Sequence, residues 1–209
     1  MYTLPEVSDT SQKRKSTLKL SDVPKYTALV HAVRRAYEHV DRGRYRLRDL
    51  ALVAVLVYTG CRLGEALKLI VKDFDVVERT VTIHQEKKGR EFHRIVPVPD
   101  RLFWEIIERY LKRFPRNSMK LFDISDRQAR NIVYKFTKRY LKEKLRPHAI
   151  RHSYAMFILK STKNLEAVRR LLGHADYKWL KVYLDHTQED LRQELEEAFR
   201  KIAIYTPIL

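Results

Sequence analysis

The sequence predicts a mainly α-helical fold with one small antiparallel β-sheet (α+β). Apolar residues recur at three- and four-residue spacing over most of the 209 residues, which is the period of amphipathic helices. Before and after residue 90 the period changes to short β-branched runs, which are typical of strands. With 44% hydrophobic residues, the chain is able to bury one core, and its length fits one domain with a short arm.

Three helices are expected in the first third of the chain. The first runs from Asp22 to Val40, with Ser21 or Asp22 as its cap, because apolar residues recur there at helical spacing. The second, Leu47–Tyr58, is apolar on every face and is expected to be buried. Thr59-Gly60 ends it, and a short third helix runs from Leu63 to about Val71.

A β-hairpin with a basic tip at Glu86–Arg90 is expected next. Strand-forming residues stand on both sides of this tip: Val76, Val81 and Ile83 before it, then Phe92, Ile95, Val96 and Val98. Pro97 and Pro99 mark the exit from the sheet, because proline does not continue a central strand.

Helices are expected over almost all of the chain after Asp100. They cover about 100–113, 125–143, 148–161, 164–172, 177–185 and 188–203, with breaks at Pro115, Pro147 and Gly173. Residues 1–20 are instead polar and carry the basic run Lys13–Lys15. We expect them to form a flexible basic arm.

The charge indicates a polyanionic partner, with nucleic acid favoured over an anionic membrane surface. There are 43 Lys and Arg against 26 Asp and Glu, which gives a net charge of +17. Thirteen of these bases and only three acids fall between Lys112 and Arg151. Such a concentrated stretch suits a surface that tracks phosphates, although a solvated basic helix face gives the same pattern.

The composition also excludes several classes of protein. The longest apolar run, Leu50–Tyr58, has nine residues, whereas a helix that spans a bilayer needs about 20. The N-terminus has no apolar signal core, so we expect a cytoplasmic, nucleoid-associated protein. Cys61 is the only cysteine, which rules out an intramolecular disulfide and a cysteine-rich zinc finger.

The first candidate site is the segment TGCRLGE, at the start of the third helix. Arg62 is expected near a helix N-terminus, where backbone N–H groups already favour an anion and a guanidinium adds a bidentate phosphate contact. Glu65 is placed to cap the helix or to hold Arg62 in position. A plain capping arrangement explains this segment equally well.

The second candidate site is PHAIRHSY, at the start of a helix. His148 and Arg151 are three residues apart, so they project from one face and are able to grip one phosphate. The histidine is also able to move a proton near neutral pH. The alternative is two solvated polar residues, and we interpret His152 as structural.

The third candidate site is LLGHAD, which Tyr183 follows nine residues after His174. Gly173 ends a helix and would present His174 to a shared pocket, whereas a tyrosine on such a helix is usually part of a core. A histidine metal site is disfavoured, because Arg146 and Arg151 repel a cation. No GxxxxGK[ST] loop supports hydrolysis of a nucleoside triphosphate.

Taken together and in this order, the motifs resemble the catalytic domain of the tyrosine recombinases, the phage-integrase family of site-specific DNA recombinases. That family combines an Arg in a TGxRxxE turn, a hairpin Lys, an HxxR box, and an LGH box with a later Tyr. The matching segments here are TGCRLGE at 59–65, KKG before VPVP at 87–99, PHAIRHSYA at 147–155, and LLGH at 171–174 with Tyr183. The resemblance extends from about Ser21 to Glu189.

The resemblance implies a role for each matching residue. Arg62 and Arg151 would neutralise the scissile phosphate, with Glu65 supporting Arg62. The other roles are assigned as follows: His148 as a hydrogen-bond partner and base, His174 as a second donor, Lys88 (or Lys87) as the acid for the 5′ oxygen, and Tyr183 as the nucleophile that forms a 3′-phosphotyrosyl link. The resemblance implies no metal, ATP or other cofactor.

The expected DNA-contacting residues are basic side chains of the hairpin and of the helix at 125–143. They are Lys87, Arg90, Arg127, Arg130, Lys135, Lys138 and Arg139. The resemblance also implies a homotetramer on paired duplex DNA sites. Residues 21–187 would form the catalytic domain, and residues 188–209 a helix and tail that dock on a neighbouring protomer or on their own core.

Two departures from the family pattern bear on these expectations. The family has an N-terminal helical domain that clamps DNA, whereas only about 20 residues precede the catalytic-type region here. We therefore expect a minimal enzyme, a fragment, or a protein that depends on an accessory DNA-binding partner. The hairpin from Lys88 to Arg94 is also one residue longer than the common KGxKxR pattern.

Other functions remain as alternatives. A type IB topoisomerase uses a similar residue set but relaxes supercoils as a monomer, and it would not bring two DNA segments together. A non-catalytic DNA-binding protein of the same fold has no need of a phenol beside two arginines. A basic membrane-surface protein is disfavoured, because no basic amphipathic helix has a broad apolar face.

Overall fold

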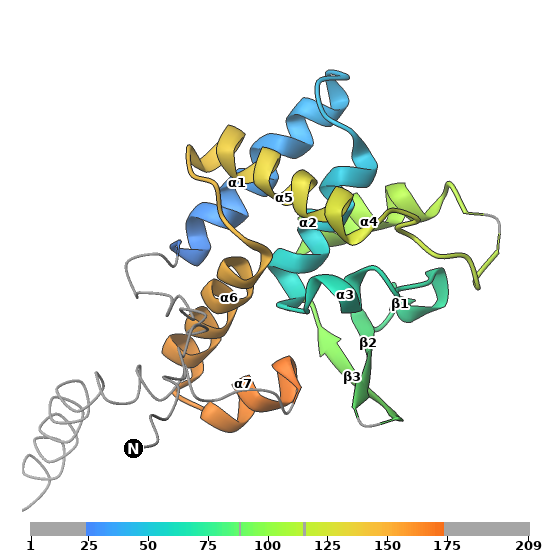
Figure 1. The fold of residues 1–209 in the computed structure, drawn as a ribbon, viewed down its shortest axis with the longest axis vertical. Coiled ribbons are helices and arrows are strands. Elements are labelled where there is room, and N and C mark those ends of the chain that lie inside the picture. Colours follow the sequence, from blue (N-terminus) through green and yellow to red (C-terminus); the bar gives the residue numbers. More distant parts are fainter. Residues whose placement is uncertain (1–23, 88, 115, 174–209) are drawn as a thin grey trace, which may run out of the picture. The chain divides into compact units, whose positions relative to one another are not determined.

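The structure is a computed structural model that describes residues 24–87, 89–114 and 116–173. The chain divides into two compact units, 1–171 and 172–209, and the description below concerns the first. In order, the elements are α1 (Tyr26–Asp41), α2 (Leu47–Thr59), α3 (Leu63–Ala66), the 3-10 turn η2 (Val71–Asp73), β1 (Phe74–Asp75), β2 (Thr80–Lys87), β3 (Arg90–Pro97), α4 (Arg101–Leu111), α5 (Asp126–Leu141), α6 (Pro147–Thr162) and α7 (Leu165–Leu172). The prediction of a mainly helical fold with one small antiparallel sheet is confirmed (Figure 1).

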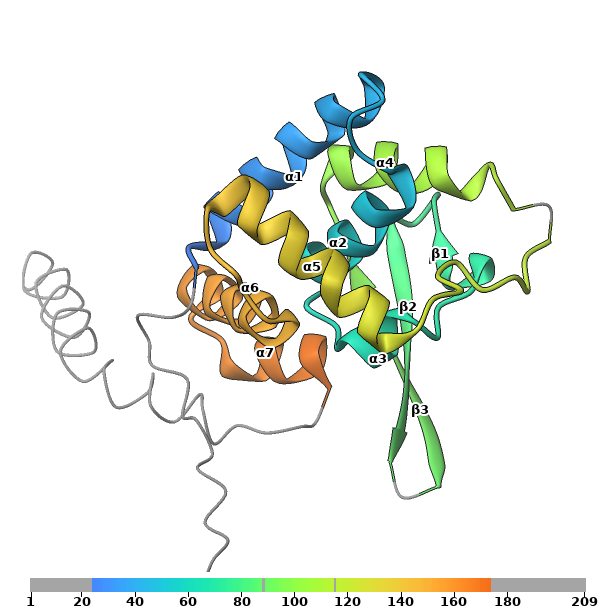
Figure 2. The ribbon, with the colours of Figure 1, turned by 45° about the horizontal axis from the view of Figure 1, so that its top comes forward.

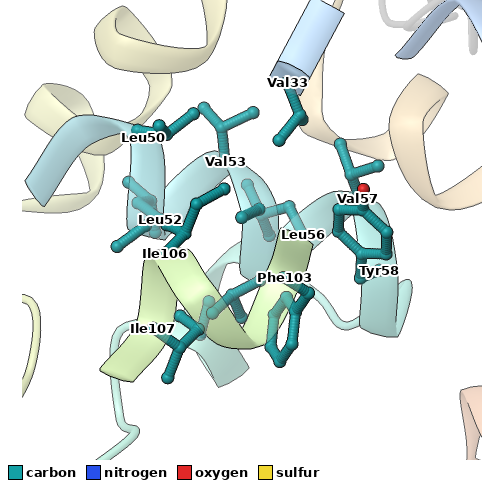
Figure 3. Close-up of a cluster of buried hydrophobic side chains, with 14 of the residues drawn as sticks. Val33, Leu50, Leu52, Val53, Leu56, Val57, Tyr58, Phe103, Ile106 and Ile107 are labelled. Atoms are coloured by element: carbon teal, nitrogen blue, oxygen red, sulfur yellow. The ribbon is translucent and has the colours of Figure 1, made fainter. Parts of the chain in front are cut away.

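Helix α2 forms the centre of the hydrophobic core. Eleven of its thirteen residues are buried, and it packs against α1, α4, α5 and α6. Figure 3 shows Leu52 and Leu56 of α2 beside Phe103, Ile106 and Ile107 of α4. The prediction that this helix is buried on every face is therefore confirmed, and the core fixes both ends of α2 in space.

Helix α1 begins later than the predicted start at Asp22. Lys25 occupies the N-cap position in an extended conformation, and the first helical residue is Tyr26. Pro24 disfavours helical geometry for the residue before it, and its carbonyl accepts a hydrogen bond from the Ser153 hydroxyl of α6. The N-cap position therefore belongs to Lys25 and not to the predicted Ser21 or Asp22.

The sheet is a three-stranded antiparallel meander in the order β1-β2-β3. Strands β2 and β3 pair from Thr80↔Pro97 to Lys87↔Arg90, so both strands extend into the segment Glu86–Arg90 that was predicted as the tip. Figure 2 shows this hairpin extending beyond the helices. Val76, which was predicted to belong to a strand, lies outside β1 and β2.

The third helix is also shorter than predicted, because the backbone turns after Ala66. Ile70 pairs with Lys120 in an isolated bridge, and the Ile70 N–H donates to the buried carboxylate of Asp73 at 2.9 Å. These contacts hold residues 70–73 in a separate turn, so the helix cannot continue to Val71.

The later helices follow the predicted order. Ser125 caps α5 by accepting from the N–H of Gln128, and Pro147 is the first residue of α6, where its missing N–H carries no cost. The predicted helices 177–185 and 188–203, the arm 1–20 and the tail 188–209 lie outside the described residues. No helix in the described ranges is long and apolar enough to cross a membrane.

Candidate active site

The Glu65 carboxylate forms the centre of the candidate site. Helix α3 starts at Leu63, directly after the turn that closes α2, and this places Glu65 in its first turn. Its oxygens accept hydrogen bonds from the Arg62 N–H at 2.9 Å, Arg62 Nη1 at 2.8 Å, Gln85 Nε2 at 2.9 Å and Arg94 Nη2 at 2.7 Å. Glu65 therefore both caps α3 and holds the guanidinium of Arg62.

These donors keep Glu65 ionised although its side chain is only 9% exposed. Burial by itself would raise the pKa of the carboxyl. The hydrogen bonds from Arg94, from the Arg62 backbone and from Gln85 outweigh burial and lower the pKa to about 2. The site thus contains a permanent negative charge that orients guanidinium groups by charge-assisted hydrogen bonds.

Arg151 of α6 belongs to the same cluster. Its guanidinium is buried, with Nη1 donating to the Gly60 carbonyl at 2.8 Å and lying 4.0 Å from Glu65 Oε2. Burial and the nearby charge of Arg62 lower the pKa of Arg151 to about 10, against the opposing effect of Glu65. Arg151 therefore remains a cation at neutral pH, fixed close to Arg62.

Gly60 makes this approach of α6 possible. It ends α2 with a φ of +61°, a conformation that costs other residues energy. A Cβ at this position would lie 2.3 Å from Cδ1 of Tyr154, one turn after Arg151 on α6. The glycine is thus required twice, for its backbone conformation and for the close contact with α6.

His148 lies one turn before Arg151 on the same helix, as predicted, and is exposed. Partial desolvation, followed by the positive charges of Arg151, Arg62 and Arg130, lowers the pKa of His148 below its usual value of 6.5. The imidazole is therefore neutral at pH 7 and able to accept a proton. For His152, burial and its cationic neighbours lower the pKa to about 4, which fits its predicted structural role.

Arg94 is a residue of the cluster to which the sequence analysis assigned no function. It pairs with the buried Ile83 in the β2–β3 ladder, so its side chain points to the inner face of the sheet and is 8% exposed. Besides its contact with Glu65, its Nε donates to the Leu171 carbonyl at 2.7 Å. Arg94 therefore connects the sheet to both α3 and the last turn of α7. The Arg of the KGxKxR pattern was the available signal.

The predicted DNA-contacting residues of α5 share one solvent-exposed face. Arg127, Lys135 and Lys138 form no ion pair within the described part of the chain. Arg130 pairs with Asp126, whereas Arg139 stacks on Tyr45 and Tyr140 and donates to a backbone carbonyl. Helix α5 thus presents a strongly basic surface. The structure does not describe the side chains of Lys87 and Arg90, so their contact with DNA stays a prediction.

Three predicted catalytic residues, Lys88, His174 and Tyr183, lie outside the described residues, so their roles stay predictions. Within the described ranges, no group of three His, Cys, Asp or Glu side chains is arranged to hold a metal ion. Cys61 is buried beside the cluster, and burial raises the pKa of its thiol to about 11. Its thiol is therefore protonated and unreactive at neutral pH.

The arrangement suits the binding of a phosphate-like oxyanion. Arg62 is 33% exposed and Arg151 is buried, so one guanidinium is accessible to a ligand while the other is held by its contacts with Gly60 and Glu65. Glu65 neutralises one of the three surrounding guanidinium charges and leaves the site cationic. Fixed donors of this kind stabilise negative charge without needing to reorganise.

Comparison with known proteins gives a consistent result. The model of the phage integrase family matches residues 28–190. Tyrosine recombinase XerA of Saccharolobus solfataricus is 32% identical over 165 residues, which cover 78% of this chain and 54% of that protein. Tyrosine recombinase XerC of Thermodesulfovibrio yellowstonii is 32% identical and is matched over 71% of this chain and 52% of that protein. The chain spans about half the length of the curated relatives it matches.

Solved structures show the same fold. The crystal structure of XerA recombinase superposes with a TM-score of 0.60 at 22% identity, covering 87% of this chain and 64% of that one. The pre-cleavage complex of XerH site-specific recombinase with its difH substrate has a TM-score of 0.62 at 21% identity, covering 86% of this chain and 54% of that one. At these identities the likeness concerns the fold alone.

Proposed function

This chain belongs to the phage integrase family, and from that premise we propose that it cleaves and rejoins duplex DNA at specific sites through Tyr183. The matched relatives named XerA and XerC are tyrosine recombinases, and the XerH site-specific recombinase structure is a pre-cleavage complex with its difH substrate. The proposal transfers this reaction to the present chain. Duplex DNA would be the substrate.

The observation that carries the proposal is the cluster around Glu65. The buried carboxylate of Glu65 accepts hydrogen bonds from the side chains of Arg62, Arg94 and Gln85. A helix cap alone does not require these side-chain donors. Glu65 holds Arg62 close to the buried Arg151, whose guanidinium is tied to the Gly60 carbonyl. Two fixed guanidinium groups are what a scissile phosphate requires as charge accumulates on its nonbridging oxygens.

In the proposed reaction the Tyr183 oxygen attacks the scissile phosphorus and forms a P–O bond, while the bond to the 5′ oxygen breaks. The lowered pKa of His148 keeps its imidazole neutral at pH 7, so the ring is available to accept the phenol proton as the tyrosine attacks. Lys88 supplies a proton to the departing 5′ oxygen, and His174 donates a hydrogen bond to the same phosphate. The products are a 3′-phosphotyrosyl link and a free 5′-hydroxyl.

Rejoining reverses these steps with a 5′-hydroxyl as the nucleophile. Each cleavage exchanges one phosphodiester for one phosphotyrosyl ester, so the energy of the bond is retained and ATP is not needed. In this proposal the two arginines supply the charge stabilisation that metal ions provide in other phosphoryl-transfer sites. Specific strand exchange would require a homotetramer on two DNA segments, with or without an accessory DNA-binding partner.

The basic face of α5 supports duplex DNA as the substrate. Arg127, Lys135 and Lys138 are exposed without an ion pair within the described residues, and Arg130 is close enough to His148 to lower its pKa. The basic face therefore starts beside the proposed chemistry and continues along the helix. The net charge of +17 favours the same polyanion.

The decisive experiment traps the covalent intermediate. The protein is incubated with a library of nicked suicide duplexes, and DNA-linked protein is sought on a denaturing gel. We expect an adduct with wild type and with the matched control Tyr177→Phe, but not with Tyr183→Phe. An adduct that persists in Tyr183→Phe moves the nucleophile elsewhere. Tight duplex binding without any adduct indicates a binding protein instead.

A further inference from the structure

A cationic cavity lies at the start of helix α2, the end opposite to the Glu65 cluster. It has a volume of about 440 Å³ and is bordered by the end of α1, the start of α2 and the end of α4. Its lining is dominated by four arginines and includes Val40, Tyr45, Arg46, Leu47, Arg48, Arg109 and Arg113. Ligand pockets are usually lined by apolar side chains, so this composition points to an anion.

Two of the four guanidinium groups already have carboxylate partners. Arg48 binds Asp49 at 2.8 Å, and Arg109 pairs with Asp41. The other two, Arg46 and Arg113, are exposed and have no ion pair within the described part of the chain. The cavity thus has four cations against two anions, and two of its donors remain available for a ligand.

The cavity is distinct from the Glu65 cluster. Leu47, which lines it, is the first residue of α2, whereas Gly60 and Arg62 of the candidate active site follow the last residue. Thirteen residues of α-helix separate the two by about 20 Å. A single phosphate cannot occupy both, so the cavity would hold a second one.

The basic face of α5 connects the two places. Its N-terminal half lies near His148, since Arg130 is among the charges that lower the pKa of that residue. Its last turn reaches the cavity, because the Arg139 guanidinium stacks 5.9 Å from the ring centroid of Tyr45, which lines the cavity. Arg139 also donates to the Arg44 carbonyl, two residues before Arg46. Basic side chains therefore continue from the active site to the cavity.

We propose that the cavity lined by Arg46, Arg48, Arg109 and Arg113 binds a backbone phosphate of the DNA about 20 Å from the scissile phosphate. Guanidinium groups are suited to this ligand because their paired N–H donors match phosphate oxygens. The contact would anchor the duplex without reading its sequence. In assigning the phosphate to DNA, the inference rests on the proposed function.

The first test measures how duplex binding depends on salt. The double variant Arg46→Gln/Arg113→Gln and the control Arg42→Gln/Lys112→Gln lose the same charge from exposed side chains, but the control residues do not line the cavity. All proteins carry Tyr183→Phe to prevent cleavage of a random duplex of about 30 base pairs. Each lost phosphate contact lowers the slope of log K against log salt by about 0.9. Because the cavity would hold one phosphate, we expect a slope lower by about 1 in the cavity variant only.

The second test uses inorganic pyrophosphate and thermal unfolding, which needs no DNA. We expect pyrophosphate to raise the Tm of the parent and the control by more than that of the cavity variant. Equal salt slopes for both double variants overturn the assignment to DNA. If the pyrophosphate effect still differs, the cavity is a site for a soluble phosphate instead, and if that effect is also equal, there is no anion site.

The two tests also separate this inference from the proposed function. If no protein of the set binds duplex DNA, the proposed function fails, and the pyrophosphate measurement alone decides whether the cavity binds phosphate. If the parent binds DNA and both double variants match it, the duplex binding that the proposed function requires is upheld and the cavity has no part in it.

Discussion

Arg94 Nη2 lies 2.7 Å from Glu65 Oε2, and this contact ties strand β3 to helix α3. Both side chains are less than 10% exposed, so each compensates the desolvated charge of the other. Since Glu65 also holds Arg62, the sheet supports a predicted catalytic arginine through an intermediate carboxylate. The position of Arg62 thus depends on a strand residue that does not contact it directly.

Replacing Arg94 with Leu is expected to reduce the free energy of unfolding by up to about 3 kcal/mol, because the buried carboxylate of Glu65 loses one of its two hydrogen-bonded guanidinium partners and keeps Arg62. Arg101→Leu, which breaks an exposed pair with Glu105, is the control and is expected to cost less than about 1 kcal/mol. Urea unfolding at pH 7 measures both. Equal losses of unfolding free energy in the two variants would show that the Arg94–Glu65 contact adds little to the stability of the protein.

Arg94→Lys separates charge from geometry. Lysine keeps the positive charge near Glu65 but cannot donate to both Glu65 and the Leu171 carbonyl in the fork that arginine provides. We expect most of the stability to return while adduct formation on suicide duplexes stays at least tenfold below wild type. Full recovery of the adduct rate would mean that charge alone positions Arg62.

The acid stability of the protein should depend on Glu65. The pKa of this carboxyl is about 2 in the folded protein and about 4.5 when unfolded, so its contribution is complete above pH 4.5. That contribution disappears as the pH falls through 2. The stability difference between wild type and Glu65→Gln should therefore shrink from pH 5 to pH 2, in urea unfolding at several pH values. The exposed Glu105→Gln is the control, and a pH-independent difference for Glu65→Gln would contradict the assignment.

The sequence predicts the helical core well because burial of α2 follows from its composition alone. A run of apolar residues from Leu50 to Tyr58 has no polar face, so it has to lie inside. The ends of α1 and α3 were less predictable, since Pro24 is held by Ser153 and Ile70 by Asp73. Contacts between distant segments override local preference there.

The same limit applies to the candidate site. Arg62, Glu65 and Arg151 stand in recognisable motifs, and the structure brings them together. Arg94 stands among strand residues, and only the pairing with Ile83 shows that its charge is directed inward, toward a carboxylate 29 residues away. The sequence shows that residue 94 is charged, but it does not show that the side chain is buried or which carboxylate it pairs with. The roles of Lys88, His174 and Tyr183 remain predictions.

His152 should make the protein sensitive to moderate acid. Its pKa is about 4 in the folded state, lowered by burial and by the charges of His148 and Arg151, against about 6.5 in the unfolded chain. As the pH falls, His152 is protonated in the unfolded chain before it is protonated in the folded protein. The free energy of unfolding therefore decreases as the pH decreases from 6.5 to 4. We expect the Tm of His152→Gln to fall less over this range than that of wild type. His31→Gln, on an exposed position of α1, is the control. Parallel Tm curves for wild type and His152→Gln would contradict this account.

Gly60 offers a test of how α6 and Arg151 are positioned. Gly60→Ala forces a side chain into a residue with a φ of +61° and places its Cβ 2.3 Å from Tyr154 Cδ1. The positive φ costs about 1 kcal/mol and the overlap about 1 to 3 kcal/mol more. Gly43→Ala is the matched control, because Gly43 has a φ of +68° and nothing within 4 Å of the added Cβ.

The difference between these two alanine variants in urea unfolding therefore isolates the overlap with Tyr154 from the backbone cost. Because the Gly60 carbonyl accepts from Arg151, a shift of α6 should also displace that guanidinium. We expect Gly60→Ala, and not Gly43→Ala, to reduce adduct formation at a temperature where both variants are folded. If Gly60→Ala and Gly43→Ala lose the same stability, α6 moves away from the added methyl group at no measurable free-energy cost. The close approach to Gly60 then does not fix the position of Arg151. If the two variants differ in stability but form the adduct equally well, adduct formation does not depend on the shift of α6.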